Sequence, residues 1–409
     1  MNRILNVLYE ERLGGPQLRV LQVARGLKVH GYETIVALPK GDPPFAQLLA
    51  QHGISFRELN LVRPRRSFDP RLHARFALRF WSNVAELRQM IRNERIEIVH
   101  TNGLANLQAA LAARREGVAL VWHLNDVFTP KLLRAALLPL VRRWADRIAV
   151  AARAVTDYCF PGDSRLAERI QLLYAPVDTQ RFNPRVDGTR VRRELGIAPD
   201  CPLIGLVANL CPGKGQEYFL EAAPLVLRRY PQAKFMLAGA RLENRRAFWE
   251  GLQQQIARLR LEGEVIFTGR RSDVPQLLRA MTVCVQASES EACPMAMLEA
   301  SASGTAVVAT RVGGTPEIVE HGVTGILIDP REPAQISRAV LHLLDAPAIA
   351  QQMGLAGARR MQERFSLEAC VEAHARMYGR ALSHAGSLEP ANVSALPPAE
   401  FVEDVYSRD

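Results

Sequence analysis

The stretch TVCVQASESEACPMAMLEA (residues 282–300) predicts a buried strand, a short loop and a helix in direct succession. Its first part, Thr282–Gln286, is mostly apolar, as in strands that are buried on both faces. Pro294 suits the first turn of a helix, so the helix is expected to begin near it. Glu291 then lies on the loop, and Glu299 lies about one and a half turns inside the helix.

The next stretch, GTAVVATRVGGTPEIV (residues 304–319), has the same order of turn, buried strand, glycine loop and helix. Gly313 and Gly314 would let the backbone approach a ligand closely, although a plain turn explains them as well. Similar apolar runs, separated by helical patterns, are strand candidates along the whole chain: Ile4–Leu8, Thr34–Leu38, Ile96–Thr101, Leu120–His123, Ile148–Ala151, Leu203–Ala208, Lys234–Ala238, Glu264–Thr268 and Ala306–Thr310. Alternating strands and helices of this kind predict an α/β fold with parallel, doubly wound sheets.

The series of strands appears twice, with turn signals at Asn183-Pro184 and Asp187-Gly188 between the two halves. We therefore predict two Rossmann-like domains, at residues 1–184 and 185–365, in a chain of 409 residues. A C-terminal helix at about 366–384 is expected to complete the first domain, and residues 386–409 are expected to form a mobile tail. Ligands of such folds bind beyond the carboxyl ends of the strands, so the site is expected in a cleft between facing domains.

Composition indicates a soluble globular protein of the cytoplasm. Hydrophobic residues are 48% and charged residues 23% of the chain, and no apolar run is long enough for a signal peptide or a spanning helix. The six cysteines are scattered without a C-x-x-C pair, which gives no support to zinc or dithiol chemistry and fits a reducing compartment.

The net charge of +10 suits anionic partners such as nucleotides, nucleic acid or an acidic membrane surface. Aromatic residues are only 6% of the chain, and neither a stacking-aromatic pattern nor a helix-turn-helix pattern is present. We therefore expect no nucleic-acid partner.

A second candidate site is the stretch VANLCPGKG (residues 207–215), between a predicted strand and a helix starting near Gln216. A lysine at a glycine-rich strand-to-helix turn can bind a diphosphate, which is the interpretation favoured for Lys214 over a surface lysine. The order of residues is not that of a P-loop, so NTP hydrolysis is not supported.

Two weaker signals lie in the first half of the chain. Gly14-Gly15 follows the first strand and could hold a phosphate at a helix N-terminus, although such a pair is more often only a turn. His100 and His123 each end a predicted strand and would line the cleft, although a lone histidine is usually structural.

Together these residues resemble the retaining glycosyltransferases of family four, which have the GT-B fold. The resemblance runs from about residue 3 to residue 383 and is closest in the second half. It rests on these positions: Gly14-Gly15, His123, Asn209 through Gly215, Phe267 through Val274, Ser288 through Glu299 and Gly304 through Val319.

The resemblance implies a role for each matching position. Glu299 would bind the ribose hydroxyls of the donor, and Glu291 would bind its sugar near the reacting end. Lys214 would hold the diphosphate with help from Gly14-Gly15.

Three further positions are also assigned by the resemblance. Arg271 lies in the loop that flanks the base in this family, and His123 matches a histidine that lines the sugar site. Asn209 stands in the donor site where many members have an arginine that is paired with the lysine. Ala292-Cys293-Pro294 replaces the usual Gly-Phe-Gly, which leaves the identity of the donor sugar open.

The implied activity is transfer of a sugar from a nucleotide-diphosphate sugar to a glycan or lipid-linked acceptor, with retention of configuration and without a metal or other cofactor. Synthesis of a cell-envelope polysaccharide or glycolipid, such as lipopolysaccharide, is the expected setting. The alternatives are an epimerase or phosphorylase on the same fold, or a catalytically silent partner subunit.

Two basic, apolar segments bear on the acceptor. One is a predicted helix with Phe76, Phe80, Val84, Leu87 and Ile91 on one face and several arginines beside them; the other is Lys131–Trp144. Both could lie on an anionic bilayer, at the inner face of the membrane, or could pack on the core of the first domain.

Overall fold

A computed structural model of the protein describes residues 1–9, 15–41, 43–62, 70–242 and 245–385. The chain divides into two compact units: Met1–Ala175 with the segment from Leu367 onward (unit 1), and Pro176–Ser366 (unit 2). The predicted boundary at 184/185 lies inside unit 2, ahead of its first helix. The predicted tail, 386–409, lies outside the described residues.

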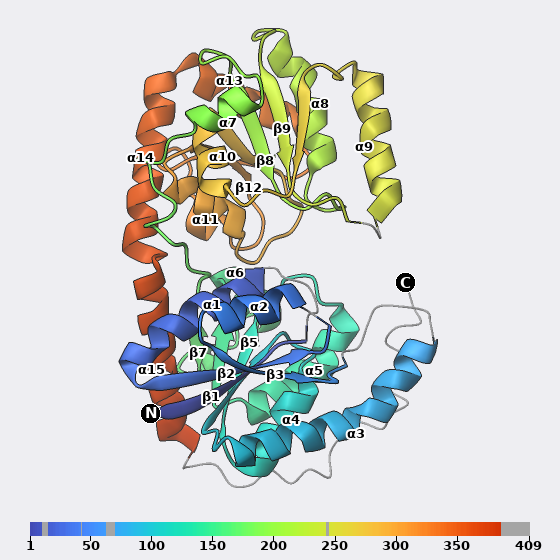
Figure 1. Cartoon of the computed structure of the whole chain (residues 1–409), viewed down its shortest axis with the longest axis vertical. Helices are drawn as coiled ribbons and strands as arrows, with labels where there is room; N and C mark the ends of the chain where they lie inside the picture. Colours follow the sequence, from blue (N-terminus) through green and yellow to red (C-terminus); the bar gives the residue numbers. More distant parts are fainter. Residues whose placement is uncertain (10–14, 42, 63–69, 243–244, 386–409) are drawn as a thin grey trace. The chain divides into compact units, whose positions relative to one another are not determined.

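Unit 1 is built on a sheet of seven parallel strands in the order β3-β2-β1-β4-β5-β6-β7 (Figure 1). The strands are β1 (Asn2–Val7), β2 (Tyr32–Pro39), β3 (Ser55–Leu59), β4 (Ile98–Asn102), β5 (Ala119–Leu124), β6 (Arg147–Val150) and β7 (Ile170–Leu172). The helices are α1 (Gly15–Leu27), η1 (Lys28–His30), α2 (Pro43–Gln51), α3 (Pro70–Asn93), α4 (Leu107–Glu116), α5 (Lys131–Trp144), α6 (Arg153–Cys159), η2 (Ser164–Leu166) and α15 (Leu367–Ala385).

Unit 2 is built on six parallel strands in the order β10-β9-β8-β11-β12-β13. The strands are β8 (Leu203–Val207), β9 (Lys234–Ala238), β10 (Val265–Gly269), β11 (Val283–Gln286), β12 (Ala306–Thr310) and β13 (Ile326–Ile328). The helices are α7 (Thr189–Glu194), α8 (Gln216–Leu227), α9 (Arg246–Leu259), α10 (Val274–Ala280), α11 (Met295–Ala302), α12 (Thr315–Ile318), α13 (Pro333–Asp345) and α14 (Pro347–Arg364).

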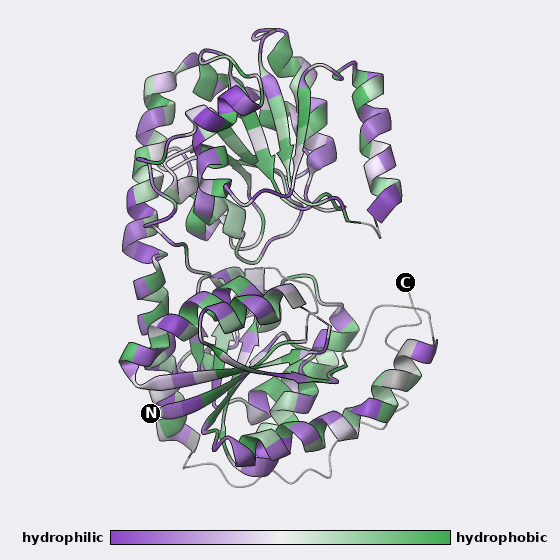
Figure 2. Ribbon diagram, in the orientation of Figure 1, coloured by the Kyte–Doolittle hydropathy of each residue, from purple (hydrophilic) through white to green (hydrophobic). Residues whose placement is uncertain are grey.

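The predicted α/β class with two parallel sheets is confirmed, and every strand predicted from a buried apolar run is present. The sequence did not predict β3, β7 and β13, which all form sheet edges. An edge strand is less covered than a central one, and no residue of β3 is buried: Phe56 and Leu59 are half-buried and the other three residues are exposed, so no continuous apolar run marks it. In Figure 2 the strands are largely hydrophobic, and purple patches lie on the helices.

Helix α15 belongs to unit 1, although it follows unit 2 in the sequence. Its residues Val371, Met377 and Tyr378 join the buried cluster that contains Ile4 of β1. Helix α1 passes close to it: a Cβ on Gly26 would lie 2.5 Å from a methyl carbon of Val371. No helix in the described part of the chain is long and apolar enough to cross a membrane.

The strand orders show where each sheet changes direction. In unit 2 the chain runs outward from β8 through β9 to β10, and then returns to place β11 on the other side of β8. In unit 1 the same change occurs between β1 and β4. Loops that leave two such strands diverge, and the crevice between them is the usual ligand site of an open α/β sheet.

Candidate active site

The predicted residues of the second half gather at the switch point of unit 2. Lys214 lies on the loop after β8, Glu291 on the loop after β11, and Gly313 on the loop after β12. These three strands are neighbours in the sheet, so their carboxyl ends meet at one edge.

Lys214 and Glu291 form an ion pair in this crevice. The Nζ atom of Lys214 lies 2.6 Å from Oε1 of Glu291, and the hydroxyl of Ser288 donates to the same oxygen at 2.9 Å. The Lys214 side chain is 34% exposed, which leaves its ammonium within reach of a ligand. A diphosphate could take the place of the carboxylate as its partner.

Backbone contacts hold the three loops together. The N–H of Glu289 donates to the carbonyl of Gly213 at 2.9 Å, and the N–H of Gly314 donates to the carbonyl of Glu291 at 3.1 Å. Gly313 has φ +47°, and a Cβ there would lie 1.6 Å from the carbonyl oxygen of Glu291. Only glycine allows this approach to the Glu291 carbonyl, and the predicted approach of this loop to a ligand stays a prediction.

Glu299 is the fifth residue of α11, which begins one residue after Pro294 as predicted. The residue as a whole is half-buried, and its carboxyl group lies in the more buried part. Burial raises the pKa of its carboxyl to about 7, against the lowering effect of the Arg181 charge. Within the described ranges no side chain hydrogen-bonds to this carboxylate, so it is available to accept ligand hydroxyls.

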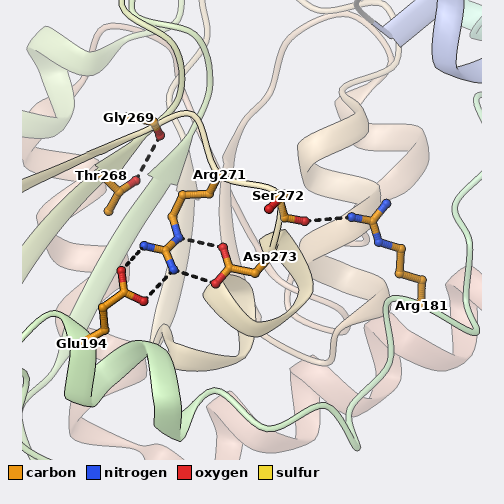
Figure 3. Close-up of polar contacts among 7 residues, drawn as sticks. All are labelled: Arg181, Glu194, Thr268, Gly269, Arg271, Ser272 and Asp273. Atoms are coloured by element: carbon orange, nitrogen blue, oxygen red, sulfur yellow. Dashed lines mark hydrogen bonds and ion pairs between the residues drawn. The ribbon is translucent and has the colours of Figure 1, made fainter. Parts of the chain in front are cut away.

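Arg271 is engaged by two carboxylates of its own unit (Figure 3). Its guanidinium binds Glu194 at 2.6 and 2.9 Å and Asp273 at 2.8 and 2.6 Å, and these hydrogen bonds raise its pKa. The side chain points toward Glu194, while Arg181 reaches the same loop at the carbonyl of Ser272, at 3.1 Å. The pairing gives Arg271 a role in shaping this loop, and its contact with a nucleotide stays a prediction.

An open hollow of about 320 Å³ lies against that loop. It is lined by Arg181, Val186, Ser272, Asp273, Pro275 and Gln276. Since the Arg181 charge also acts on Glu299, the hollow and the α11 carboxylate are parts of one region of unit 2.

For two predicted parts of the donor site, Asn209 and Gly14-Gly15, the described part of the structure gives no contact that bears on ligand binding. Asn209 is exposed and ties the loop after β8 to the loop after β9, because its Oδ1 accepts the N–H of Ala240 at 3.3 Å. Gly15 is the first residue of α1, whereas Gly14 lies outside the described residues. Binding by these residues stays a prediction.

In unit 1, His123 at the end of β5 is fully buried. Its Nε2 lies 3.0 Å from a guanidinium nitrogen of Arg19, and its Nδ1 lies 3.1 Å from Nε2 of His100. Arg19 is also buried and donates to Oδ1 of Asn102 at 2.7 Å. Both ring nitrogens of His123 are thus occupied by protein groups, and its contact with a sugar stays a prediction.

The donors in this network fix the protonation of the rings. Arginine can only donate, so Nε2 of His123 accepts and its proton lies on Nδ1, which donates to His100. Nδ1 of His100 then carries a proton that is donated to the hydroxyl of Tyr378 on α15, at 2.7 Å. Both rings are therefore neutral, because a second proton on either would face another donor.

The same conclusion follows from the electrostatics. Burial lowers the pKa of both His100 and His123 well below the ordinary value, and the nearby Arg19 charge lowers both further. Burial also lowers the pKa of His374, on α15, to about 4. Its ring is stacked on that of His100 at 6.1 Å, so three neutral imidazoles lie together, and one of them, His123, contacts the buried guanidinium of Arg19.

Two family models match the chain: "Glycosyltransferase Family 4" over residues 13–181 and "Glycosyl transferases group 1" over residues 201–346. A D-inositol 3-phosphate glycosyltransferase of Streptomyces griseus is 30% identical over 322 residues, which cover 70% of this chain and 67% of the relative. The chain belongs to the group 1 and family 4 glycosyltransferases.

A second relative of this glycosyltransferase is the lipopolysaccharide core biosynthesis mannosyltransferase LpsB of Rhizobium meliloti. It is 29% identical over 244 residues, 58% of this chain and 66% of the relative. Among solved structures, HepE of Anabaena in complex with UDP and glucose superposes with a TM-score of 0.80 at 25% identity, covering 93% of this chain and all of HepE. The fold is thus GT-B, as expected from the sequence.

Two polar side chains of this glycosyltransferase carry contacts that the sequence did not predict. Ser288 lies in the stretch of residues 282–300, but no role was predicted for its side chain. Arg19 is one of many arginines, and no sequence pattern distinguishes it. In the described part of the chain no three His, Cys, Asp or Glu side chains are grouped to hold a metal ion. That transfer needs no metal stays a prediction.

Proposed function

We propose that this glycosyltransferase moves a sugar from a nucleoside-diphosphate sugar to a glycan or lipid-linked acceptor, with retention of anomeric configuration. The observation that carries the proposal is the Lys214–Glu291 ion pair at the switch point of unit 2. It presents a cation for a diphosphate and a carboxylate for sugar hydroxyls at one point.

The remaining parts of the donor fit around that pair. Lys214 exchanges Glu291 for the diphosphate, and the released carboxylate binds the sugar. The Glu299 carboxylate accepts the ribose hydroxyls, and the hollow lined by Arg181 and Ser272 takes the base. HepE, the structural relative solved with UDP and glucose, makes uridine the first base to test.

The chain's own contribution to the reaction is electrostatic. Negative charge grows on the diphosphate as the bond to the sugar breaks, and a preorganised cation at that position stabilises the transition state. Lys214 is held in place by the loop contacts of Gly213, so little reorganisation is needed when the charge develops. Attack from the same face as the leaving group would retain the configuration.

The acceptor class is supported by the relatives. LpsB acts in lipopolysaccharide core biosynthesis, and the Streptomyces griseus relative is named for a phosphorylated polyol. We propose an envelope glycan or glycolipid as the acceptor, reached at the inner face of the membrane.

The direct test is transfer. The protein is incubated with UDP-, GDP- and ADP-sugars and membrane extracts that supply acceptors, and the product's anomeric configuration is read by NMR. We expect one donor to be consumed with release of its nucleoside diphosphate and an α-donor to give an α-product. Conversion of the donor to an epimer, or consumption that depends on inorganic phosphate, would instead identify one of the two alternative enzymes.

Donor affinity should depend on pH through Glu299. A ribose hydroxyl donates to the ionised carboxylate, and a group with a pKa of about 7 is mostly protonated at pH 6. Raising the pH from 6 to 8 is expected to tighten binding of an intact nucleotide sugar about tenfold, measured by calorimetry. The intact donor is used because its diphosphate does not titrate in this range. In Glu299→Gln the donor affinity should be weaker and should not change with pH. If donor affinity changes equally with pH in the variant and the wild type, Glu299 does not bind the ribose.

Exposed apolar side chains support contact of unit 1 with a bilayer. On α3, Leu78 is 82% exposed and Trp81 is half exposed, three residues apart on one face, with the guanidinium of Arg115 5.2 Å from the Trp81 ring. The other half of the helix packs inward through Val84 and Leu87. The later turns of the helix thus pack on the core, whereas Phe76 and Phe80 are half-buried and Leu78 and Trp81 are exposed and available to a lipid surface.

Replacing Leu78 and Trp81 together by serine should reduce binding to vesicles that contain phosphatidylglycerol by about tenfold, because two apolar side chains no longer enter the bilayer. Co-sedimentation at low salt measures the bound fraction. Leu355→Ser, at an exposed leucine of unit 2, is the control and should bind as the wild type does. Equal binding by all three proteins would place the membrane contact elsewhere or exclude it.

A further inference from the structure

The loop that carries Glu291 holds a second carboxylate, Glu289, with two side-chain partners of its own. The hydroxyl of Tyr218 donates to Oε1 at 2.9 Å, and the guanidinium of Arg331 binds Oε2 at 2.5 Å. These contacts, the one from Arg331 first, lower the pKa of Glu289, so it is an anion. We call Tyr218, Glu289 and Arg331 the Glu289 clamp.

The clamp joins the segments that form the donor site. Tyr218 lies in the first turn of α8, directly after the loop of Lys214, and Arg331 follows β13. The backbone N–H of Glu289 donates to the carbonyl of Gly213, next to Lys214. Glu289 is thus tied to the Lys214 loop by its main chain and to two further segments by its side chain, two residues from Glu291.

One residue of the clamp, Arg331, lies in a turn and has an unusual backbone conformation. Arg331 has φ +62°, the left-handed region that a residue with a side chain seldom adopts. Its side chain is 66% exposed, and exposed ion pairs add little to stability. The ion pair of the clamp is therefore expected to contribute little to folding.

We propose that the Glu289 clamp positions the Lys214–Glu291 pair for the donor's diphosphate and sugar. The proposal rests on the proposed function and deepens it. The three residues act through Lys214 and Glu291, so they are positioning residues. The clamp is fixed to the diphosphate end of the site. Its loss should therefore weaken binding of the diphosphate and leave binding of the ribose at Glu299 and of the base at Ser272 unchanged.

The chain contains a matched control at the far end of α8. There the hydroxyl of Tyr230 donates to Asp345 at 2.7 Å, and Arg229 binds the same carboxylate oxygen at 2.8 Å. Tyr218 lies in the first turn of α8, whereas Tyr230 lies three residues beyond the last residue of the helix, Leu227. The two triads have the same chemistry, but only the first touches the loops of Lys214 and Glu291.

The experiment compares Glu289→Gln, Tyr218→Phe and Asp345→Asn in the full chain. Affinities for UDP and for uridine, with GDP and guanosine as the second pair, are measured by calorimetry, and steady-state transfer gives kcat and KM. We expect Glu289→Gln to weaken nucleoside diphosphate binding and to lower kcat/KM, each about tenfold, with Tyr218→Phe intermediate. Nucleoside affinity should stay within twofold, and Asp345→Asn should match the wild type in every readout but melting temperature.

Two results would overturn the clamp alone: unchanged diphosphate affinity in Glu289→Gln, or an equal loss of affinity for nucleoside and nucleoside diphosphate, which indicates general damage to the unit. Because Tyr218→Phe removes one hydroxyl and leaves the ion pair, it separates positioning from misfolding if Glu289→Gln is unstable. A wild-type protein that binds no nucleoside diphosphate at all would overturn the proposed function and the clamp with it.

Discussion

Lys214→Ala is expected to lower kcat by a hundredfold or more at saturating donor, a loss of about 3–4 kcal/mol of transition-state stabilisation. Lys214 supplies the cation at the switch point of unit 2, and the diphosphate gains charge only as the sugar leaves. Without the ammonium, Glu291 keeps only the Ser288 hydroxyl and faces the diphosphate as an unneutralised anion. Quenched-flow or steady-state measurement of nucleoside diphosphate release gives the rate.

The control is Lys234→Ala. Lys234 is a lysine of the same unit, but it lies at the amino-terminal ends of the strands, whereas Lys214 lies beyond their carboxyl ends. It begins β9, and its Nζ donates to the carbonyl of Gly263 at 2.6 Å. Its removal should leave kcat within twofold. If Lys214→Ala raises KM but keeps kcat, Lys214 only binds the donor; if neither constant changes, the site assignment fails.

The sequence predicted those strands in which consecutive residues are nearly all apolar. The strands at Lys234–Ala238 and Ala306–Thr310 begin and end as predicted, because central parallel strands are apolar throughout their length. Strand β3 has no such run, since its position at the edge leaves three of its five residues exposed. Pairing at an edge depends on the neighbouring strand, and the local sequence does not mark it.

The candidate site also has features that the sequence predicted and features that it did not. Sequence and topology together bring Lys214 and Glu291 to one edge, since carboxyl ends of neighbouring parallel strands lie side by side. The 2.6 Å contact between them was not predicted, because it depends on how closely the loops approach. The two loops are joined by the N–H of Glu289, which donates to the carbonyl of Gly213, and the glycine loop after β12 packs on the Glu291 carbonyl because Gly313 has no Cβ.

Partners that come from distant segments were not predictable. For Arg271 a place beside the base stays a prediction, and the pairing of its guanidinium with Glu194, 77 positions earlier in the chain, was not predicted. For His123 the resemblance implies a place in the sugar site, which stays a prediction; the network that joins it to His374, on a helix from the far end of the sequence, was not predicted. Nothing local to either residue indicates these contacts, because they depend on the packing of whole elements.

That histidine network leads to the second large effect, a loss of stability of unit 1 in weak acid, between about pH 6.5 and pH 4. The folded pKa of His100, His123 and His374 is lowered, whereas in the unfolded chain each has its ordinary value of about 6.5. Below pH 6.5 the unfolded state therefore binds more protons than the folded state, and stability falls as pH falls. For His374 the fall continues to about pH 4, which amounts to about 3 kcal/mol from this residue alone.

The three rings together should make unit 1 lose up to about 4 kcal/mol per pH unit below pH 6, since each unbalanced proton contributes about 1.4 kcal/mol per unit. Hydrogen exchange of amides in β4 and β5, compared with those in β8, measures this unit by unit. His374→Gln stays neutral and should reduce the slope by one proton, whereas the exposed His52→Gln should leave it unchanged. A slope that is equal in both units would mean that the buried rings are protonated without cost, which their packing around the Arg19 guanidinium argues against.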